Sequence, residues 1–472
     1  MKILVLGGTG AMGVPLVEIL KTKEYKTVVT TRNRRESVGT IVYQYGNAKE
    51  INFLNKLLSD DWDVIVDFMQ YNTTEFENRI NLLLSKCKQY FFISSCRVYA
   101  DSIVPIVESS ARLLDITGNK EFLQSGNYSL EKARQENVLF NSKKRNWTII
   151  RPYITYYTHR LQLGIFEKEE WLKRALNGQT IVLPKDIANA KTSITFGQDV
   201  ARAIYLLMGT ENALGEIYHV VNEETKTWNE ILCIYINMIQ KYTGRKCKIK
   251  YVDNSKELVR IWDRYIIEYD RLYDRIFDSS KIKRMCPSLE FSPIQEGIEK
   301  CICEFLDNIN WRDFSPVLQA WEDKNSNEIM PLWNISIKDR FEYLYYRFIE
   351  YDFNIFFHEK NWNRILIYGL GKWGMNLYDG INEEEYEIVC LGDGRKEYYQ
   401  EKLKRKVYNI CELVDERFDV CIITSIAHSR EIVDEFQNYG MPAENIILFS
   451  DLVYTMLIKQ FIDINKIKPL EQ

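Results

Sequence analysis

The sequence predicts an α/β protein with a doubly wound parallel sheet and a second, smaller α/β domain of the same architecture. Apolar runs typical of buried strands alternate with helical patterns from residue 1 to about residue 208. The same alternation begins again near residue 362, and in each half the first apolar run enters a glycine turn. Strands that alternate with helices form parallel sheets, because each helix returns the chain to the edge where the next strand begins.

The first half of the chain contains the longer series of strand patterns. In chain order they read KILVLGG, KTVVTTR, DVIVDFM, YFFISS and NWTIIRP. Farther along, GEIYHVVN predicts one more strand, and SPIQEGIEKCICEFLDNI predicts a closing amphipathic helix. We therefore assign residues 1–308 to a first domain.

The second half begins with an aromatic stretch. Residues 309–361 are rich in Trp, Tyr and Phe, whereas a flexible linker is polar and rich in Gly and Ser. We predict a helical connector there that packs on a neighbouring part of the chain. RILIYGLGKWG, YEIVCLGD, FDVCIITS and ENIILFSD then predict the strands of a second domain over residues 362–472.

Composition and charge predict a soluble cytoplasmic protein that binds neither nucleic acid nor a membrane. Hydrophobic residues make up 46% of the 472 residues, charged residues make up 27%, and the formal net charge is −4. No apolar run approaches the roughly 20 residues that a membrane span requires, and the N-terminus lacks a signal-peptide pattern. The ten cysteines contain no Cys-x-x-Cys pair and the four histidines are scattered, so we predict no metal site.

The first glycine turn predicts a dinucleotide site. Gly7, Gly10 and Gly13 lie between a strand and a helix, with Ala11 and Met12 inside the turn. Glycines there allow a tight turn and close approach of the backbone to a pyrophosphate, which faces the free N–H groups of the helix. The alternative is a purely structural turn.

The end of the second strand predicts NADP as the cofactor, with NAD as the alternative. An acidic residue usually binds the ribose hydroxyls of NAD at this point. Here Thr31 and Arg32 begin a stretch that contains further arginines and lacks a carboxylate before Arg35. Guanidinium groups suit a 2′-phosphate. The other interpretation is that Arg34 and Arg35 belong to a solvated loop.

A tyrosine and a lysine four residues apart, Tyr128 and Lys132, form a candidate proton-transfer pair because residues four apart share a helix face. The spacing alone is unspecific. It recurs at Tyr45, Tyr242, Tyr368 and Tyr398. Only Tyr128 follows a buried strand that ends in serines, Ser94 and Ser95, so its context separates it from the other copies.

Five motifs, taken in order along the chain, resemble those of the extended short-chain dehydrogenase/reductase family. They are the first glycine turn, ISSCRVY, YSLEK, IIRPY and TSITFGQDVARAI. In the last motif, Asp199 occupies its usual position. This family includes nucleotide-sugar epimerases and dehydratases. The resemblance covers residues 1–308 and implies a Rossmann-type dinucleotide-binding core with a substrate-binding part. It also implies a homodimer.

The resemblance implies a role for each matched residue. Tyr128 is the base that takes a proton from a substrate hydroxyl, and Ser95 bonds the reacting oxygen. Lys132 holds the nicotinamide ribose and lowers the pKa of Tyr128, which is near 10 in a free tyrosine. Asn47 stands where the family often has an aspartate near the adenine, and its side chain can still bond a base edge.

Several positions depart from the family pattern. Ala100 and Tyr157 replace glycines, Ile154 replaces an asparagine, and DFMQY replaces the small residues after the fourth strand. The dehydratases carry an Asp-Glu pair where this chain has Cys96 and Arg97, which argues against a dehydratase. Because these positions surround the expected substrate, the resemblance does not identify the sugar.

The second glycine turn carries Gly369, Gly371 and Gly374, and Asp393 ends the next strand. It is similar to Rossmann-like modules appended to bacterial polysaccharide enzymes and sugar methyltransferases. A second nucleotide site and a purely structural or oligomerising role both remain open. Trp373 inside the turn is bulky enough to occlude a pyrophosphate.

We therefore predict NADP-dependent oxidation or reduction of a nucleotide sugar, by a ketosugar reductase or an epimerase. The abundance of Lys, Ile, Asn and Tyr suggests an AT-rich bacterial genome and, by association, cell-surface polysaccharide biosynthesis. The alternative is a non-catalytic NAD(P)-binding sensor or interaction protein, since some atypical family members sense redox state or bind RNA. A third possibility is a bifunctional protein whose C-terminal module recruits a partner enzyme.

Overall fold

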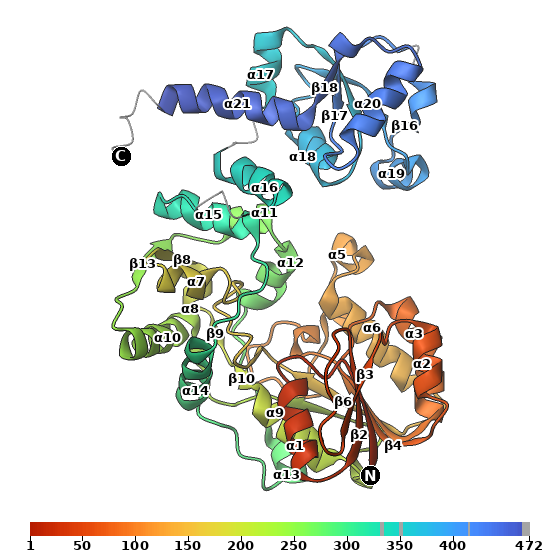
Figure 1. Ribbon diagram of the computed structural model, residues 1–472, viewed down its shortest axis with the longest axis vertical. Coiled ribbons are helices and arrows are strands. Elements are labelled where there is room, and N and C mark those ends of the chain that lie inside the picture. Colours follow the sequence, from red (N-terminus) through yellow and green to blue (C-terminus); the bar gives the residue numbers. More distant parts are fainter. Residues whose placement is uncertain (331–334, 349–352, 414–415, 465–472) are drawn as a thin grey trace. The chain divides into compact units, whose positions relative to one another are not determined.

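The computed structural model describes residues 1–330, 335–348, 353–413 and 416–464. The chain divides into two compact units, Met1–Leu318 and Gln319–Gln472. The division falls inside the stretch 309–361, and the predicted boundaries at 308 and 361 stay predictions. Each unit contains a parallel sheet with helices, which confirms the predicted fold class (Figure 1).

The first unit is built on a seven-stranded parallel sheet with the spatial order β11-β6-β5-β4-β1-β2-β3. The strands are β1 (Lys2–Leu6), β2 (Lys26–Thr31), β3 (Ile41–Tyr45), β4 (Trp62–Asp67), β5 (Cys87–Ile93), β6 (Trp147–Pro152) and β11 (Glu216–Val220). The order reverses between β1 and β4, so the carboxyl ends of these two strands flank a crevice where ligands bind in such sheets.

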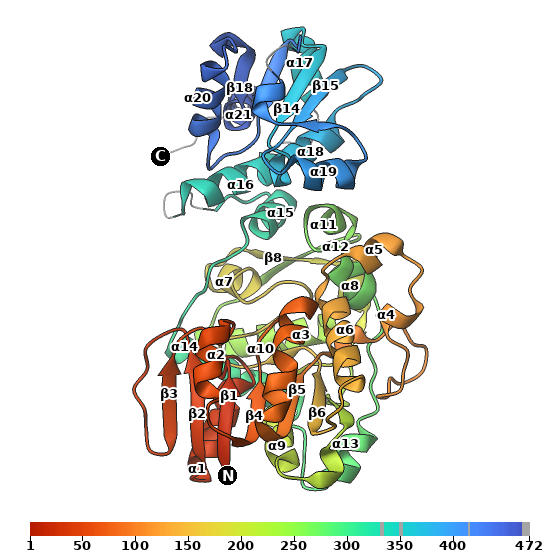
Figure 2. The ribbon, with the colours of Figure 1, turned by 90° about the vertical axis from the view of Figure 1, so that its right-hand side faces the viewer.

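Both faces of this sheet are buried, because side chains alternate between the faces along each strand. Ile3 and Val5 pack under α1 (Gly13–Thr22) and α9 (Gly197–Leu207). Leu4 and Leu6 pack on the opposite face. That face is covered by α2 (Ile51–Leu57), α3 (Thr73–Ser85) and α6 (Tyr128–Phe140) (Figure 2).

The rest of the first unit consists of short strand pairs and helices. The pairs are β7 (Thr155–Tyr156) with β10 (Thr195–Phe196), β8 (Thr180–Pro184) with β13 (Lys248–Val252), and β9 (Lys191–Thr192) with β12 (Lys226–Thr227). The helices are α4 (Leu113–Ile116), α5 (Lys120–Gln124), α7 (Trp171–Leu176), α8 (Lys185–Asn189), α10 (Trp228–Thr243), α11 (Lys256–Ile261), α12 (Arg264–Ile266), α13 (Ser280–Met285) and α14 (Ile294–Asp307). Asp199 on α9 accepts hydrogen bonds from the backbone and hydroxyl of Ser292, so it fixes the chain just before α14.

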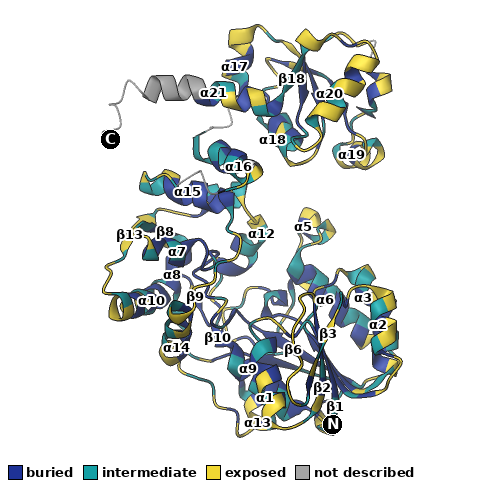
Figure 3. Ribbon diagram, in the orientation of Figure 1, coloured by how far each residue is buried: buried dark blue, intermediate teal, exposed yellow. Residues whose placement is uncertain are grey.

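The second unit has a five-stranded parallel sheet with the order β16-β15-β14-β17-β18. Its strands are β14 (Arg364–Tyr368), β15 (Glu387–Gly392), β16 (Val407–Tyr408), β17 (Val420–Ile423) and β18 (Ile446–Leu448). The helices are α16 (Ile337–Phe348), α17 (Phe353–Lys360), α18 (Lys372–Gly380), α19 (Lys396–Leu403), α20 (Ser429–Asn438) and α21 (Phe449–Ile464), and α15 (Pro316–Ser326) crosses the division. Aromatic residues of α16 and α17, including Phe341 and Phe357, share one buried cluster with Ile365 of β14. Figure 3 shows the central strands of both sheets as buried, whereas the edge strands β3 and β18 are more exposed.

No helix in the described part of the chain combines the length and the apolar character that a membrane crossing needs.

A buried ion pair fastens α6 to the first sheet. Glu136 of α6 accepts two hydrogen bonds of 2.7 Å from the guanidinium of Arg151 on β6. It also accepts bonds from Ser94, at 2.6 Å, and from Arg112, at 3.1 Å. Glu136 and Arg151 are almost fully shielded from solvent. A buried pair of this kind is destabilising to break, because the remaining charge loses its partner.

We expect Glu136→Gln to lower the free energy of unfolding by about 3–5 kcal/mol, because Arg151 would stay buried without a carboxylate. Urea unfolding of the full chain, followed by tryptophan fluorescence, measures the change. The control is Glu299→Gln, which breaks an ion pair with Lys241 on the surface of α14 and should leave the unfolding midpoint in place. An unchanged midpoint for Glu136→Gln would contradict the anchoring role.

Candidate active site

The helix α6 brings three polar side chains to one face. Tyr128 is its first residue, and the side chain of Asn127 caps the helix by accepting a hydrogen bond of 3.1 Å from the backbone N–H of Ser129. Tyr128, Lys132 and Glu136 recur at intervals of four residues and therefore share one face. Since Glu136 is fixed to β6, the other two side chains lie along the carboxyl end of β5.

The two serines after β5 have different partners. The hydroxyl of Ser94 donates to Glu136 at 2.6 Å. The hydroxyl of Ser95 accepts from the backbone N–H of Arg97 at 3.2 Å, and Ser95 lines the same cavity as Tyr128. Ser94 is therefore engaged by α6, and the role of Ser95 beside the phenol stays a prediction.

One cavity of about 400 Å³ unites Ser95, Tyr128 and Lys132. It lies at the carboxyl ends of β4, β5 and β6, where Met69, Ile93 and Pro152 contribute to its wall. The ammonium group of Lys132 donates to the carbonyl of Ile93 at 2.8 Å and lies 5.9 Å from the ring centroid of Tyr128. The three residues predicted to act together thus line one site.

Burial has the largest effect on the pKa values of Tyr128 and Lys132. It raises the pKa of Tyr128, against the charge of Arg97 and the nearby hydroxyl of Ser95, which both lower it. We expected Lys132 to be the cation that lowers the pKa of the tyrosine, but the charges that lower it are those of Arg97 and, to a smaller extent, Arg160. Burial also lowers the pKa of Lys132 to about 8, against the charges of Asp67 and Glu136. Lys132 is therefore mostly protonated at neutral pH.

Asp67, the last residue of β4, lies buried behind the site. Its carboxylate accepts hydrogen bonds from the backbone N–H of Met69 and the hydroxyl of Tyr90, each at 2.9 Å, and from Tyr71 at 3.5 Å. Burial is the largest influence and raises its pKa to about 6, while the charge of Lys132 lowers it. Asp67 stands where the family pattern has a small residue, and sequence reasoning noted the departure without assigning it a role.

The first glycine turn has the shape that a pyrophosphate requires. Gly7 has a φ of 73°, which favours glycine. A Cβ atom on Gly13 would approach the backbone carbon of Gly8 to 2.6 Å, so only glycine lets α1 pack this closely. A Cβ atom on Gly10 would meet nothing within 4 Å, which leaves open space beside the N-terminus of α1. The residues present fit a dinucleotide phosphate group.

The glycine turn and the tyrosine belong to adjoining cavities. A second cavity of about 320 Å³ is lined by Gly7, Gly10, Ala11, Met12 and Gly13. The two cavities share four lining residues: Met12, Phe68, Thr155 and Arg160. The two cavities therefore adjoin at these four side chains, between the glycine turn and Tyr128.

The remaining predicted cofactor residues lie outside these two cavities. Thr31 is buried, and its hydroxyl bonds to the backbone of Asn33. Arg32 is exposed, directly after β2. Asn47 accepts a hydrogen bond from the backbone N–H of Lys49 at 3.1 Å, within its own turn. Their roles in binding the ribose, its phosphate and the adenine stay predictions.

The structure also brings residues to the cavity that sequence reasoning left without a role: Arg97, Arg160, Gln162 and Arg271. Arg97 was visible as a departure from the dehydratase pattern, but the other three had no local signal. Ile154 also lines the cavity and has a φ of 35°. Asparagine tolerates this left-handed region better than a β-branched residue does, so the site keeps a strained backbone where the family's asparagine is replaced.

The second unit has a cavity of about 580 Å³ at its own glycine turn, lined by Gly369, Gly371 and Asp393 among others. Asp393 is already bonded to the backbone N–H groups of Leu370, at 2.6 Å, and Arg395, at 2.8 Å. Gly374 is packed against the turn, where a Cβ atom would lie 2.0 Å from the carbonyl oxygen of Gly369. Trp373 packs against aromatic rings of α16, including Tyr345 at 4.8 Å between centroids. The second nucleotide site stays a prediction.

Two segments of the chain match models of known protein families. Residues 3–221 match the model of the NAD dependent epimerase/dehydratase family, and residues 361–447 match a model described as C2185-like, N-terminal. The chloroplast stem-loop binding protein of 41 kDa b from Arabidopsis thaliana is 27% identical over 246 residues. The match covers 48% of this chain and 60% of that protein, less than two thirds of its length.

Solved structures share the fold of the first unit. WbmH from Bordetella bronchiseptica, in complex with NAD+, is 16% identical with a TM-score of 0.51, covering 65% of this chain and 99% of that one. The dTDP-glucose 4,6-dehydratase from Bacillus anthracis, in complex with NAD, is 17% identical with a TM-score of 0.51, covering 66% and 98%. The UDP-glucuronic acid 4-epimerase from Bacillus cereus, in complex with UDP-glucuronic acid and NAD, is 16% identical with a TM-score of 0.50, covering 66% and 100%.

The raised pKa of Asp67 predicts a pH dependence of stability. The folded state holds the proton up to about pH 6, and the ordinary value is 3.8. The stability contributed by this group is therefore complete below about pH 4 and is lost as the pH rises to about 6. Asp67→Asn cannot ionise, so its stability relative to the wild type should rise by up to roughly 3 kcal/mol between pH 4 and pH 7.

Urea unfolding of both proteins at the two pH values measures this difference. Asp63→Asn on the same strand is the matched control, because a hydrogen bond from Lys88 lowers the pKa of Asp63. The difference in unfolding free energy between Asp63→Asn and the wild type should change only below about pH 4. If the difference in unfolding free energy between Asp67→Asn and the wild type is equal at pH 4 and pH 7, the carboxyl of Asp67 does not titrate in this range.

Proposed function

Because residues 3–221 match the model of the NAD dependent epimerase/dehydratase family, we propose that this protein is an enzyme that oxidises or reduces a carbon of a nucleotide sugar. The observation that carries the proposal is that the cavity at the glycine turn shares lining residues with the cavity that contains Ser95, Tyr128 and Lys132. A nicotinamide dinucleotide, when bound, supplies the group that takes up or returns a hydride.

The side chains have distinct roles in this proposal. The phenol oxygen of Tyr128 takes the proton from the substrate hydroxyl, or returns it in the opposite direction. Ser95 holds the reacting oxygen beside that phenol. Burial opposes the phenolate, and the charge of Arg97 favours it. Arg160 is the second charge that favours it. Lys132 is held by the carbonyl of Ile93 on the same face of α6 as Tyr128, where it would hold the nicotinamide ribose.

The cofactor would be held by the first glycine turn, with its pyrophosphate against Gly10 and the N-terminus of α1. We propose NADP rather than NAD because Arg32 follows β2 where NAD enzymes carry a carboxylate. Arg34 and Arg35 lie over the rings of Tyr45 and Tyr43, at 5.6 and 5.8 Å, so their side chains are engaged on β3. The solved structures above contain NAD, which is the alternative.

A reductase and an epimerase both fit this site. An epimerase retains its cofactor, because one cycle oxidises and re-reduces the same carbon, whereas a reductase exchanges it at every turnover. Mass spectrometry of the cofactor that co-purifies, together with calorimetry for NADP and NAD, separates them. As in the sequence analysis, we propose a cytoplasmic homodimer and a role in polysaccharide biosynthesis.

A second candidate function is nucleic-acid binding without turnover, because the Arabidopsis relative is a stem-loop binding protein. The formal net charge of −4 argues against it, since binding to phosphates depends on positive charge. Binding of an RNA hairpin without any oxidation or reduction of sugar nucleotides would favour this second candidate.

We expect Tyr128→Phe to lower kcat by about 10²–10⁴-fold, the usual contribution of a general acid–base group. Binding of the cofactor should stay nearly unchanged, because only the phenol oxygen is lost. Steady-state kinetics and calorimetry measure the two effects. Turnover at the wild-type level would exclude Tyr128 as the base.

We expect Arg32→Asp to shift the cofactor preference from NADP toward NAD, because a carboxylate repels the 2′-phosphate and binds ribose hydroxyls. The ratio of the two dissociation constants measures the shift. Arg202→Asp on α9 serves as the control for an added negative charge outside both cavities. If the ratio stays the same in Arg32→Asp, the 2′-phosphate is recognised elsewhere.

A further inference from the structure

The cavity around Tyr128 carries an excess of positive charge. Four cationic side chains line it: Lys132, Arg97, Arg160 and Arg271. Among the described residues that line this cavity there is no Asp or Glu. A buried surface with one sign of charge attracts a ligand of the opposite sign.

Arg97 is the cation with the weakest internal compensation. Its Nε atom is buried and has no hydrogen-bond partner, and it lies 3.9 Å from the nearest oxygen of Asp270. The side chain is only 16% exposed. Burial lowers the pKa of Arg97, and the charge of Asp270 opposes that change. A buried charge that lacks a close partner is unfavourable unless a ligand supplies one.

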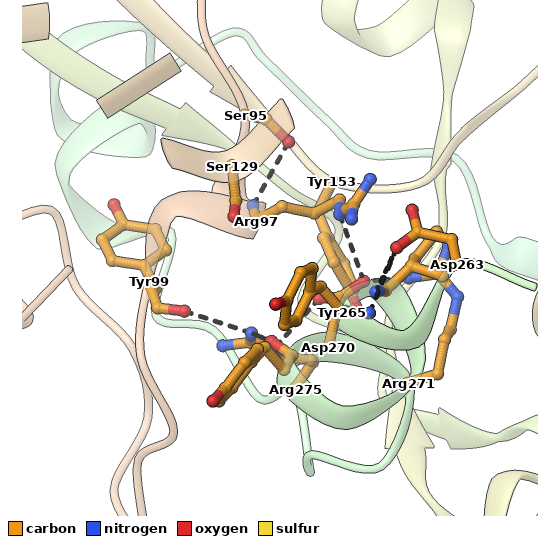
Figure 4. Close-up of polar contacts among 12 residues, drawn as sticks. Ser95, Arg97, Tyr99, Ser129, Tyr153, Asp263, Tyr265, Asp270, Arg271 and Arg275 are labelled. Atoms are coloured by element: carbon orange, nitrogen blue, oxygen red, sulfur yellow. Dashed lines mark hydrogen bonds and ion pairs between the residues drawn. The ribbon is translucent and has the colours of Figure 1, made fainter. Parts of the chain in front are cut away.

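Asp270 cannot provide that partner, because other groups already occupy it. It pairs with Arg271, and it accepts hydrogen bonds of 3.2 Å from Arg275 and from the hydroxyl of Tyr153. Figure 4 shows Arg97 between Ser95 and this group of residues. One carboxylate is therefore shared by three arginines.

The other arginines have structural partners of their own. Arg275 donates to the carbonyls of Tyr99, Ala100 and Tyr269. Arg271 donates to the carbonyl of Gly164 at 2.8 Å. Arg160 is partly exposed and pairs with Glu167 at 3.3 Å. Arg97 is therefore the guanidinium whose charge is least balanced by protein groups, and an anion of a ligand would balance it.

The position of Arg97 restricts where that anion lies on a ligand. Its guanidinium carbon is 5.3 Å from the ring centroid of Tyr128, and its backbone N–H donates to Ser95. The cation therefore stands beside the two side chains that would hold the reacting oxygen. A ligand group that pairs with it must be attached close to the reacting carbon. The pyrophosphate of the cofactor belongs at the glycine turn instead.

We propose that the substrate is acidic on the sugar itself, with a carboxylate next to the reacting carbon, and that Arg97, supported by Arg271, binds this carboxylate. The planar guanidinium fork matches the two oxygens of a carboxylate. The substrate class is thus a nucleotide uronate rather than a neutral nucleotide hexose. The inference rests on the proposed function of the same cavity and deepens it.

Calorimetry on the NADP-saturated full chain tests this with two matched pairs: UDP-glucuronate against UDP-glucose, and GDP-mannuronate against GDP-mannose. Within a pair, only the carboxylate differs. We expect the uronate of at least one pair to bind roughly 10- to 100-fold more tightly, the effect of a hydrogen bond to a charged group. Equal affinity within the pair that binds would overturn the inference and leave the nucleotide-sugar function intact. If no sugar nucleotide binds, the proposed function fails as well.

Substitutions of Arg97 test whether this residue causes the preference for the uronate over the neutral sugar. Arg97→Gln should weaken uronate binding roughly 10- to 100-fold and affect the neutral sugar far less, so that the preference disappears. Arg97→Lys keeps the charge without the fork and should retain part of it. Arg202→Gln is the same substitution outside the cavity, and this variant should retain the full preference for the uronate. NADP affinity reports whether each variant is folded, and a preference that survives in folded Arg97→Gln would overturn the assignment.

Discussion

The ion pair between Glu136 and Arg151 is the interaction on which the geometry of the active site depends. A helix is a rigid element, so fixing one turn of α6 to β6 also sets the direction of the turns before it. Tyr128 and Lys132 precede Glu136 at intervals of four residues on the same face. The bond from Ser94 to Glu136 adds the end of β5 to this arrangement. Ser94 is thus bonded to Glu136, and Ser95 is the serine that we propose acts together with Tyr128.

Electrostatics gives this rigid frame its chemistry. Lys132 stands between buried carboxylates and the cavity, so its charge is partly compensated by Asp67 and Glu136. The nearest carboxylate to Arg97 is that of Asp270, which is shared with other arginines and lies 3.9 Å away. Such an excess of buried positive charge is unfavourable in the empty protein, and a negatively charged ligand relieves it. Residues that weaken the fold in this way are typical of binding sites, where stability is exchanged for function.

The second unit shows that architecture and chemistry are separate. Its sheet also reverses strand order beside a glycine turn, and a cavity forms at that point, as parallel sheets generally provide. However, the carboxylate of Asp393 is bonded to the backbone of the turn, and Trp373 is packed among the aromatic rings of α16. The same fold therefore supplies a place for a ligand without determining which ligand it takes.

The sequence by itself determined the fold class, because strand and helix periodicities and glycine turns are local patterns that do not depend on distant contacts. It also singled out Ser95, Tyr128 and Lys132 as a group, since a motif order can be matched along the chain. Only the tertiary structure decided the surroundings of these residues. Arg97 and Asp270 are far apart in sequence, as are Glu136 and Ser94, and no local pattern announces such pairs. The charge of the cavity is a sum over side chains from several elements, so it exists only once the chain has folded.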